Sequence, residues 1–129
     1  MNVDGNPKWI STEQVLHIHQ KTIELQGGLP GIRDTGLLES ALARPENHYA
    51  YGEQDKFELA AAYAEGIARN HPFVDGNKRT AYVTADFFLY QNGYDFGIKD
   101  EEKQITFFED FAAGNVTRDA MAAFYRQNS

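Results

Sequence analysis

The chain has 129 residues, 42% hydrophobic and 13% aromatic, which is enough apolar side chain to fill the core of a single domain. Its 12 Lys and Arg against 19 Asp and Glu give a net charge of −7, which repels nucleic acid backbones and anionic membranes. The lack of cysteine excludes disulfides, thiolate catalysis and Cys-ligated zinc, and no membrane span or secretory signal is found. We therefore expect one domain, residues 1–129, that works in the cytoplasm without direct contact with nucleic acid or membrane.

Helical periodicity prevails along the chain, and recognisable residues bound each predicted helix. A first helix is predicted to begin at Ser11, which has capping-box spacing to Gln14, and to end at the glycine- and proline-rich stretch 27–31. That stretch predicts a loop or a short hairpin. A second helix is predicted from Asp34, its N-cap, to Pro45, which lacks the amide proton that would continue it. The apolar face of the first helix is predicted to hold Val15, Leu16, His19 and Ile23.

A third helix is predicted to begin at Asp55 and to end near Asn70, because Pro72 cannot continue it. Residues 71–76 must then turn the chain before the next helical pattern begins. The apolar residues of segment 80–90 cover most of the circumference of a helix, which is typical of a helix packed on nearly all sides. We expect that helix to be the central one.

The last third of the chain predicts two further helices. A short extended piece is expected at 94–98, followed by a helix from Asp100 to Ala112 and a final helix capped by Thr117. The alternation that is typical of strands never holds for more than a few residues. The predicted fold class is therefore all-α, with six helices.

The segment HPFVDGNKRT, residues 71–80, combines a histidine, a carboxylate, a turn and two cations at the start of a helix. The first amides of a helix lack internal partners and bind phosphate oxygens, and Gly76 leaves their approach open. Asn77 can offer a side-chain amide there, and Lys78 and Arg79 add positive charge. Because the protein as a whole is acidic, this gathering of cations predicts an anion site.

Two more residues of this segment suit catalysis. Asp75 can hold Mg²⁺ through its carboxylate, with water and nucleotide oxygens completing the octahedron. His71 can act as a general base, because imidazole titrates near neutral pH and can take a proton from an attacking hydroxyl. A simpler interpretation stays open from the residues alone: Asp75 or Asn77 could only cap the helix, and His71 could be buried against a backbone carbonyl.

The same segment resembles the active-site signature of the Fic/Doc (Fido) family, commonly written HxFx(D/E)GNxxR or close to it, with the arginine here one position earlier, at Arg79. The resemblance extends to IHQKTIELQGGLPGIRD at 18–34 and LLESALARP at 37–45, which are similar to the Doc branch of that family. It therefore covers most of the chain. The resemblance implies a compact six-helix Fic/Doc bundle, with the active-site loop before a central buried helix.

Carried over position by position, the resemblance implies a role for each residue of the motif. His71 would be the catalytic base toward a target hydroxyl, Asp75 would bind Mg²⁺, and Arg79 would hold a nucleotide phosphate. Gly76, Asn77 and the amides that follow, beginning with Lys78, would form the anion hole. The resemblance also implies a flap against which the target's extended chain docks by main-chain pairing, formed by Gly27, Gly28, Leu29, Pro30, Gly31 and Arg33.

Two departures from the pattern of AMP-transferring Fic enzymes bear on the reaction. Lys78 replaces the usual glycine, and Tyr82 stands where those enzymes carry a second arginine for the nucleotide tail. The Doc branch shares both departures and is associated with a reversed nucleotide, whose γ-phosphoryl group faces the target. The resemblance thus implies a toxin that uses ATP to phosphorylate Thr or Ser of a protein, typically translation elongation factor Tu, and so blocks translation. AMP transfer stays the alternative, because Gly76 and the HPF start are closer to ordinary Fic enzymes.

Members of this family are restrained by a glutamate in an (S/T)xxxE(G/N) helix. Glu65 and Gly66 match its end, but Ala61 stands in the Ser/Thr position, and we interpret the match as coincidence. The resemblance then implies restraint by a separate antitoxin of Phd type, whose C-terminal helix would lie in a groove of this protein. A rival from another class is a helical binding module without catalysis, and the intact polar residues of the motif argue against it.

Overall fold

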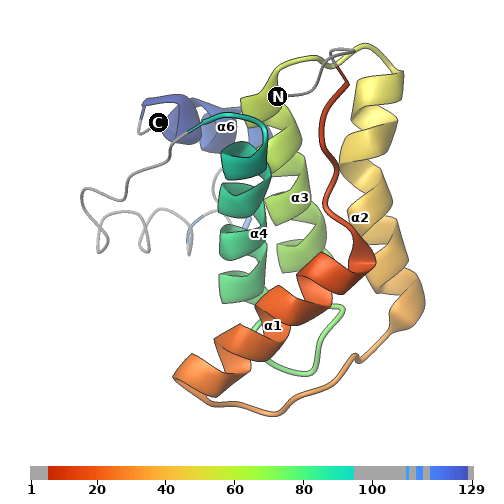
Figure 1. Ribbon diagram of the computed structural model, residues 1–129, viewed down its shortest axis with the longest axis vertical. Helices are drawn as coiled ribbons and strands as arrows, with labels where there is room; N and C mark the ends of the chain where they lie inside the picture. The colour runs from red at the N-terminus through yellow and green to blue at the C-terminus, as the bar shows by residue number, and fades with distance from the viewer. Residues whose placement is uncertain (1–5, 95–109, 111–112, 115–116, 128–129) are drawn as a thin grey trace.

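The computed structural model describes residues 6–94, 110, 113–114 and 117–127, which form five helices (Figure 1). These are α1 (Thr12–Gln26), α2 (Thr35–Ala50), α3 (Lys56–Asn70), α4 (Asn77–Gln91) and α6 (Arg118–Gln127). The described ranges contain no β-strand, which confirms the all-α prediction for them. The predicted extended piece at 94–98 and helix at 100–112 lie, but for a few residues, outside these ranges, so six helices stay a prediction. None of the helices described is long and apolar enough to cross a bilayer.

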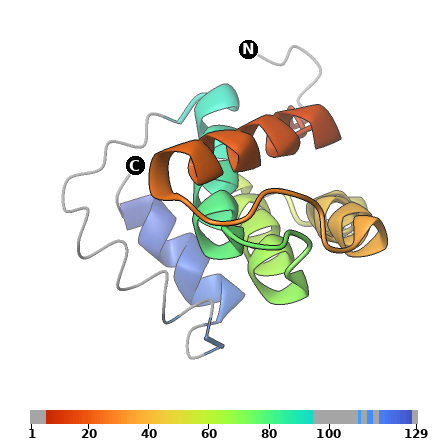
Figure 2. The same cartoon turned by 90° about the horizontal axis from the view of Figure 1, so that it is seen from below.

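The centre of the bundle is α3, with α2 and α4 antiparallel to it on either side, α6 against a third side, and α1 across α4 (Figures 1 and 2). Ten of the 15 residues of α3 are buried, against eight of 15 in α4. The prediction that the 80–90 helix is the central one is therefore wrong. Val83 and Phe87 are only half buried and Tyr90 is 70% exposed, so the apolar residues of α4 include a face that no described helix covers.

The predicted helix starts are confirmed by their capping contacts. The Ser11 side chain accepts the N–H of Gln14, and the Gln14 side chain accepts the N–H of Ser11, which completes a capping box. Asp34, Asp55 and Thr117 each accept a backbone N–H from the first turn of α2, α3 and α6 respectively. Of these caps, that of Asp34 lies at the end of the connection between α1 and α2, which forms part of the site described below.

The prediction that Pro45 ends the second helix is wrong, because α2 continues through it to Ala50. Pro45 has no amide proton, so the Ala41 carbonyl loses its helical partner. At this level α2 lies directly against α3, since a Cβ added to Gly66 would lie 2.9 Å from the Ala41 oxygen. Pro45 itself is buried. Packing of α2 along α3 therefore outweighs the local cost of the proline.

The close approach of α2 and α3 can be tested by Gly66→Ala. Helix propensity alone would make this change stabilising. We expect instead a loss of about 1–3 kcal/mol in the free energy of unfolding, because the new Cβ would lie 2.9 Å from backbone. Urea denaturation of the parent and the variant measures the loss. In the control Gly36→Ala the added Cβ meets only a side-chain oxygen, and equal stability of the two variants would contradict the close approach.

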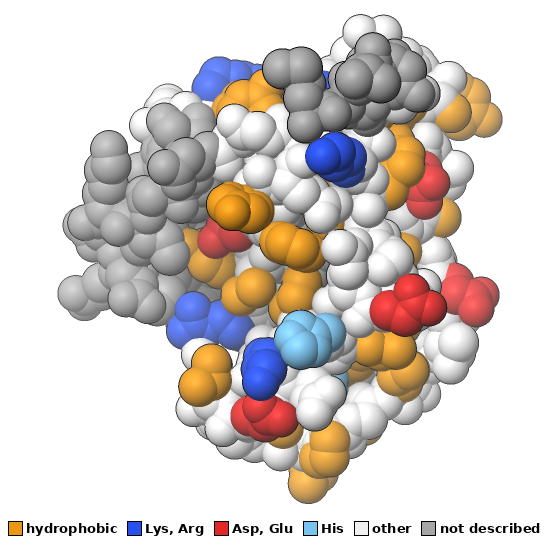
Figure 3. Space-filling view, viewed as in Figure 1, with side chains coloured by type: hydrophobic (Ala, Val, Ile, Leu, Met, Phe, Trp, Pro, Cys, Tyr) orange, Lys and Arg blue, Asp and Glu red, His pale blue; other side chains and the backbone are white. Residues whose placement is uncertain are grey.

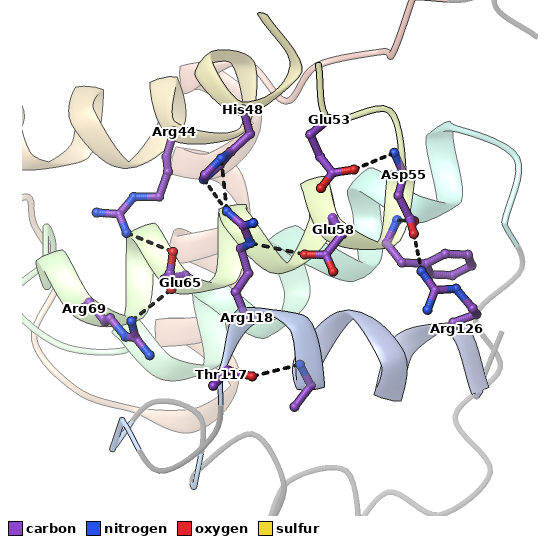
Figure 4. Close-up of polar contacts among 12 residues, drawn as sticks. Arg44, His48, Glu53, Asp55, Glu58, Glu65, Arg69, Thr117, Arg118 and Arg126 are labelled. Atoms are coloured by element: carbon purple, nitrogen blue, oxygen red, sulfur yellow. Dashed lines mark hydrogen bonds and ion pairs between the residues drawn. The ribbon is translucent and has the colours of Figure 1, made fainter. Parts of the chain in front are cut away.

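The helix α6 is attached to α2 and α3 by charged side chains (Figure 4). Arg118 of α6 donates to Glu58 of α3 at 3.2 Å and also contacts the imidazole of His48 of α2. Arg126, near the end of α6, pairs with Asp55, the N-cap of α3. The C-terminal helix is thus tied to the start of the central helix, at the opposite end of α3 from the motif.

Candidate active site

The two connections at the lower end of the bundle in Figure 1 lie side by side (Figures 1 and 2). We call residues 71–76, between α3 and α4, the motif loop, and residues 27–34, between α1 and α2, the flap. Ile32 and Phe73 form an antiparallel bridge. Its two hydrogen bonds run from the Arg33 N–H to the Pro72 oxygen at 2.7 Å and from the Val74 N–H to the Gly31 oxygen at 3.1 Å.

The flap therefore uses one edge to bind the motif loop. Consecutive residues of an extended segment direct their backbone groups to opposite sides. Since residues 31 and 33 bond to the motif loop, the N–H and C=O of Ile32 lie on the other edge. The side chain of Leu29 is 64% exposed, and Pro30 is exposed as well. This outer edge can pair with an extended chain from another molecule.

His71 ends α3 in the left-handed conformation, with φ 50° and ψ 55°. Among the described residues it is the one non-glycine residue with positive φ. Its side chain is exposed, so it is not the buried histidine of the simpler interpretation. An exposed imidazole at this turn is accessible to a hydroxyl group from outside the protein.

Asp75 is held at two points, and its carboxylate keeps one oxygen available. Its Oδ2 accepts the N–H of Leu29 in the flap at 2.7 Å, and its backbone oxygen lies 2.8 Å from Nε2 of His19 in α1. No described residue bonds to Oδ1, and the described part holds no cluster of three or more metal-ligating side chains. Mg²⁺ in proteins is often held by one or two carboxylates with phosphate and water oxygens. A single free carboxylate oxygen beside the uncapped start of α4 fits that mode of binding.

The start of α4 is open to an anion. Gly76 is its N-cap with φ 77° and ψ 17°, and no side chain caps its first amides. A Cβ at Gly76 would lie 3.2 Å from Ile23 Cδ1 and 3.4 Å from Thr22 Cγ2, so α1 packs closely behind the turn. Asn77 is buried, and its carboxamide is occupied by the N–H and C=O of Phe73, each at 2.9 Å. The backbone amide of Asn77, rather than its side chain, is therefore the group that remains for a phosphate.

The two cations of the motif, Lys78 and Arg79, lie in different environments. Lys78 is exposed in the first turn of α4. Arg79 is half buried, and the Gln26 carboxamide, with its oxygen toward the guanidinium, accepts from Nε and Nη2 at 2.7 Å each. Gln26 ends α1, so this contact joins the end of α1 to the first turn of α4. A phosphate reaching Arg79 would have to share its donors with Gln26.

Sequence reasoning missed two side chains that shape the motif loop. The ring of His19 stacks on that of Phe73, with centroids 3.8 Å apart and planes inclined by 8°, while its Nε2 contacts the Asp75 carbonyl. Arg33, predicted to serve target docking, instead directs its guanidinium to the carbonyls of Asn70 and His71. One feature of the sequence could have indicated the role of His19: it is a polar residue on the apolar face of the first predicted helix.

A groove follows the face where α1 crosses α4, and apolar side chains gather in that region (Figure 3). It consists of two cavities of about 420 Å³ each, which share His17, Ile18 and Val83. One cavity extends to Arg79 and the other to Phe87. We call this the α1–α4 groove. Its lining is mainly apolar, and one of its ends is the arginine of the motif.

Glu65 lies in a different environment. Its carboxylate pairs with Arg44 of α2 at 3.1 Å and with Arg69 of α3 at 2.9 Å (Figure 4). The neighbouring Gly66 lies directly against Ala41 of α2, with no room for a Cβ. Both residues therefore have a role in packing α2 on α3, which favours the interpretation that their match to an inhibitory motif is coincidence.

Comparison with known proteins agrees with the motif. A family model described as "Fic/DOC family" matches residues 9–89, which include the flap and the motif loop. The chain is 44% identical over 85 residues to "Protein kinase doc" of Escherichia phage P1, covering 65% of this chain and 68% of that protein. It is 37% identical over 100 residues to "Toxin Doc" of Mycolicibacterium smegmatis, covering 75% and 77%. The chain belongs to the Fic/DOC family.

Proposed function

We propose that the protein is a toxin that transfers the γ-phosphoryl group of ATP to a Thr or Ser hydroxyl of a protein, with translation elongation factor Tu as the expected target. The observation that carries the proposal is the open start of α4, where Gly76 leaves the first amides uncapped by any side chain. An exposed His71 and a carboxylate with a free oxygen, on Asp75, lie on the loop that leads into it. Similarity to a protein named as a kinase supports phosphoryl transfer over other chemistries.

In this reaction the hydroxyl oxygen of the target bonds to the γ-phosphorus, the bond to the β–γ bridging oxygen breaks, and ADP leaves. His71 takes the hydroxyl proton. The first amides of α4 and the guanidinium of Arg79 donate to the phosphate oxygens, where charge is spread in the transition state. Asp75 would hold Mg²⁺ against the phosphates, and the bound ion would neutralise their charge.

The outer edge of the flap gives the target a place beside His71. An extended segment of the target would pair with the N–H and C=O of Ile32, as a strand added to a free edge. Because the inner edge of the flap is bonded to the motif loop, this pairing would hold the target within reach of the loop. Main-chain pairing gives affinity without demanding a particular target sequence.

AMP transfer is the second candidate, because Gly76 agrees with the glycine of the AMP-transferring pattern. Tyr82, which stands in the position of the second arginine of that pattern, is buried with 6% exposure. It supplies no charge to a nucleotide tail. The difference favours γ-phosphoryl transfer over AMP transfer.

The labelled phosphate decides between these functions. The protein is incubated with Mg²⁺, a translation extract or purified elongation factor Tu, and ATP that carries label in either the α or the γ phosphate. Transfer of γ label to protein supports the proposal, and transfer of α label identifies an AMP transferase. Absence of transfer from both, with ATP binding absent as well, would favour the binding module. Phosphopeptide mapping then identifies the modified residue.

We further propose that a Phd-type antitoxin restrains the protein by laying an apolar helix face into the α1–α4 groove. The groove joins two mainly apolar cavities between α1 and α4, which suits helix-in-groove recognition. It ends at Arg79, so a helix bound there would lie beside the phosphate site. A short open reading frame next to the gene would identify the candidate partner.

The groove proposal is tested by Val83→Glu, which places a charge where both cavities meet. We expect affinity for the antitoxin to fall at least about tenfold, because burying an unpaired charge in an apolar site is costly. Isothermal titration with the antitoxin measures the affinity. Tyr90→Glu adds the same charge to α4 at a residue that is 70% exposed and lines neither cavity, so it serves as the control. Equal affinities of both variants would exclude this groove as the binding site.

A further inference from the structure

Arg33 lies in the flap, but its side chain is directed to the end of α3. Its Nε donates to the His71 oxygen at 2.7 Å and its Nη2 to the Asn70 oxygen at 2.9 Å. The last carbonyls of a helix have no helical partner, and the planar fork of a guanidinium can bind two of them together. Arg33 thus binds the carbonyls on both sides of the His71 Cα.

The backbone of His71 needs such support, because a left-handed conformation is unfavourable for a residue with a Cβ, here with φ 50° and ψ 55°. On its other sides the turn is fixed by the His71 N–H, which donates to Ile67 at 3.2 Å, and by the Pro72 oxygen, which accepts from the backbone N–H of Arg33 and Asp34. Arg33 therefore contributes both its backbone and its side chain to this one turn.

We infer that Arg33 is a positioning residue for His71: by binding the carbonyls of residues 70 and 71 it fixes the turn that holds the imidazole toward the target hydroxyl. The inference rests on the proposed function, in which His71 is the base. It assigns to Arg33 a role inside the protein, beyond that of a flap residue available to the target.

The residues proposed to bind Mg²⁺ and phosphate, Asp75 and Gly76, are not hydrogen-bonded to the Arg33 side chain and are held by other residues. Asp75 is held by the Leu29 N–H and by His19, and Gly76 packs against α1. Loss of the guanidinium should therefore displace the base and leave nucleotide binding intact. Such a separation of kcat from KM is not expected of a residue that only stabilises the fold.

The test compares Arg33→Ala and Arg33→Lys with the parent. For Arg33→Ala we expect kcat for γ-phosphoryl transfer to fall about 10- to 100-fold, since small misplacements of a reacting group have effects of this size. KM for ATP should change less than about threefold, because the contacts of Asp75 and α4 remain. Arg33→Lys should recover part of kcat, since one ammonium can bind one of the two carbonyls. The control Arg44→Ala removes the same charge and an ion pair to Glu65, away from the motif loop, and should keep kcat.

A second measurement keeps the inference independent of activity. In ¹⁵N relaxation spectra, Arg33→Ala should make the His71 and Val74 amides more mobile, while the amides of α1 stay as in the parent. Parental kcat in a folded Arg33→Ala protein, or a rise in KM with kcat unchanged, would overturn the inference. If Arg33→Ala does not fold, the same comparison of kcat and KM is made for Arg33→Lys, and the same outcomes support or overturn the inference. If the parent itself transfers no phosphate, the proposed function fails, and the mobility of His71 alone then decides whether Arg33 fixes this turn.

Discussion

His71→Ala is expected to lower kcat by about 10²- to 10⁴-fold, the usual contribution of a general base. The imidazole is exposed, so its removal leaves no cavity in the core. Alanine also keeps the Cβ, so the left-handed turn at φ 50° carries a similar strain in both proteins. The loss should therefore appear in the chemical step and not in stability.

Initial rates of γ-phosphoryl transfer at saturating ATP measure this effect, together with circular dichroism and thermal unfolding of each protein. Tyr51→Ala is the control, because Tyr51 at the C-terminal end of α2 is 92% exposed and belongs neither to the motif loop nor to the α1–α4 groove. It should react at the parental rate. Transfer by His71→Ala at the parental rate would remove His71 from the mechanism.

Asp75→Asn is expected to lower kcat/KM by about 10²- to 10³-fold, because the ion that would neutralise the phosphate charge is held less tightly. The substitution is chosen because the two functions of the side chain can be separated. An asparagine oxygen can still accept the N–H of Leu29, which Asp75 accepts at 2.7 Å. The negative charge that would hold Mg²⁺ is lost. The flap contact is thus preserved while metal binding is weakened.

The dependence on Mg²⁺ shows whether the carboxylate acts through the metal. ATP binding is measured by titration calorimetry at increasing Mg²⁺ concentrations. Asp75→Asn should need a higher Mg²⁺ concentration than the parent to bind ATP with the same affinity. Glu39→Gln removes one exposed carboxylate from α2 and should leave the Mg²⁺ dependence as it is. An Asp75→Asn protein with the parental Mg²⁺ dependence would show that the ion is held elsewhere.

The parts of the fold that could be predicted are those decided within a few residues. Capping depends on contacts across two or three positions, so Ser11, Asp34 and Thr117 marked their helices correctly. The prediction for Pro45 is wrong because the rule that proline ends a helix is local, whereas the packing of α2 on α3 decides the outcome here. The central helix was assigned wrongly for a related reason, since an apolar face on α4 looks the same in sequence whether it is buried or lines a groove.

The residues of the candidate site can likewise be separated into those that the sequence predicts and those that only the fold brings together. His71, Asp75 and Gly76 lie within six consecutive residues, so their gathering at one helix start could be predicted from spacing. The residues that hold the motif loop come from elsewhere in the chain: His19 is 56 residues from Asp75, and Arg33 is 38 residues from His71. No local pattern relates such residues to each other. Only the fold reveals that the side chain of Arg33 binds the end of α3.

The position of α1 has a consequence for how the protein can be regulated. One face of α1 supports the motif loop through His19 and the packing behind Gly76, and another face is a wall of the α1–α4 groove. Anything that alters the spacing of α1 and α4 therefore changes the surroundings of Gly76 and Arg79. Because coupling between two binding sites is reciprocal, a nucleotide that favours one spacing must alter the affinity of the groove for its occupant by the same factor. Under the proposed function, ATP binding and occupation of the α1–α4 groove would therefore influence each other.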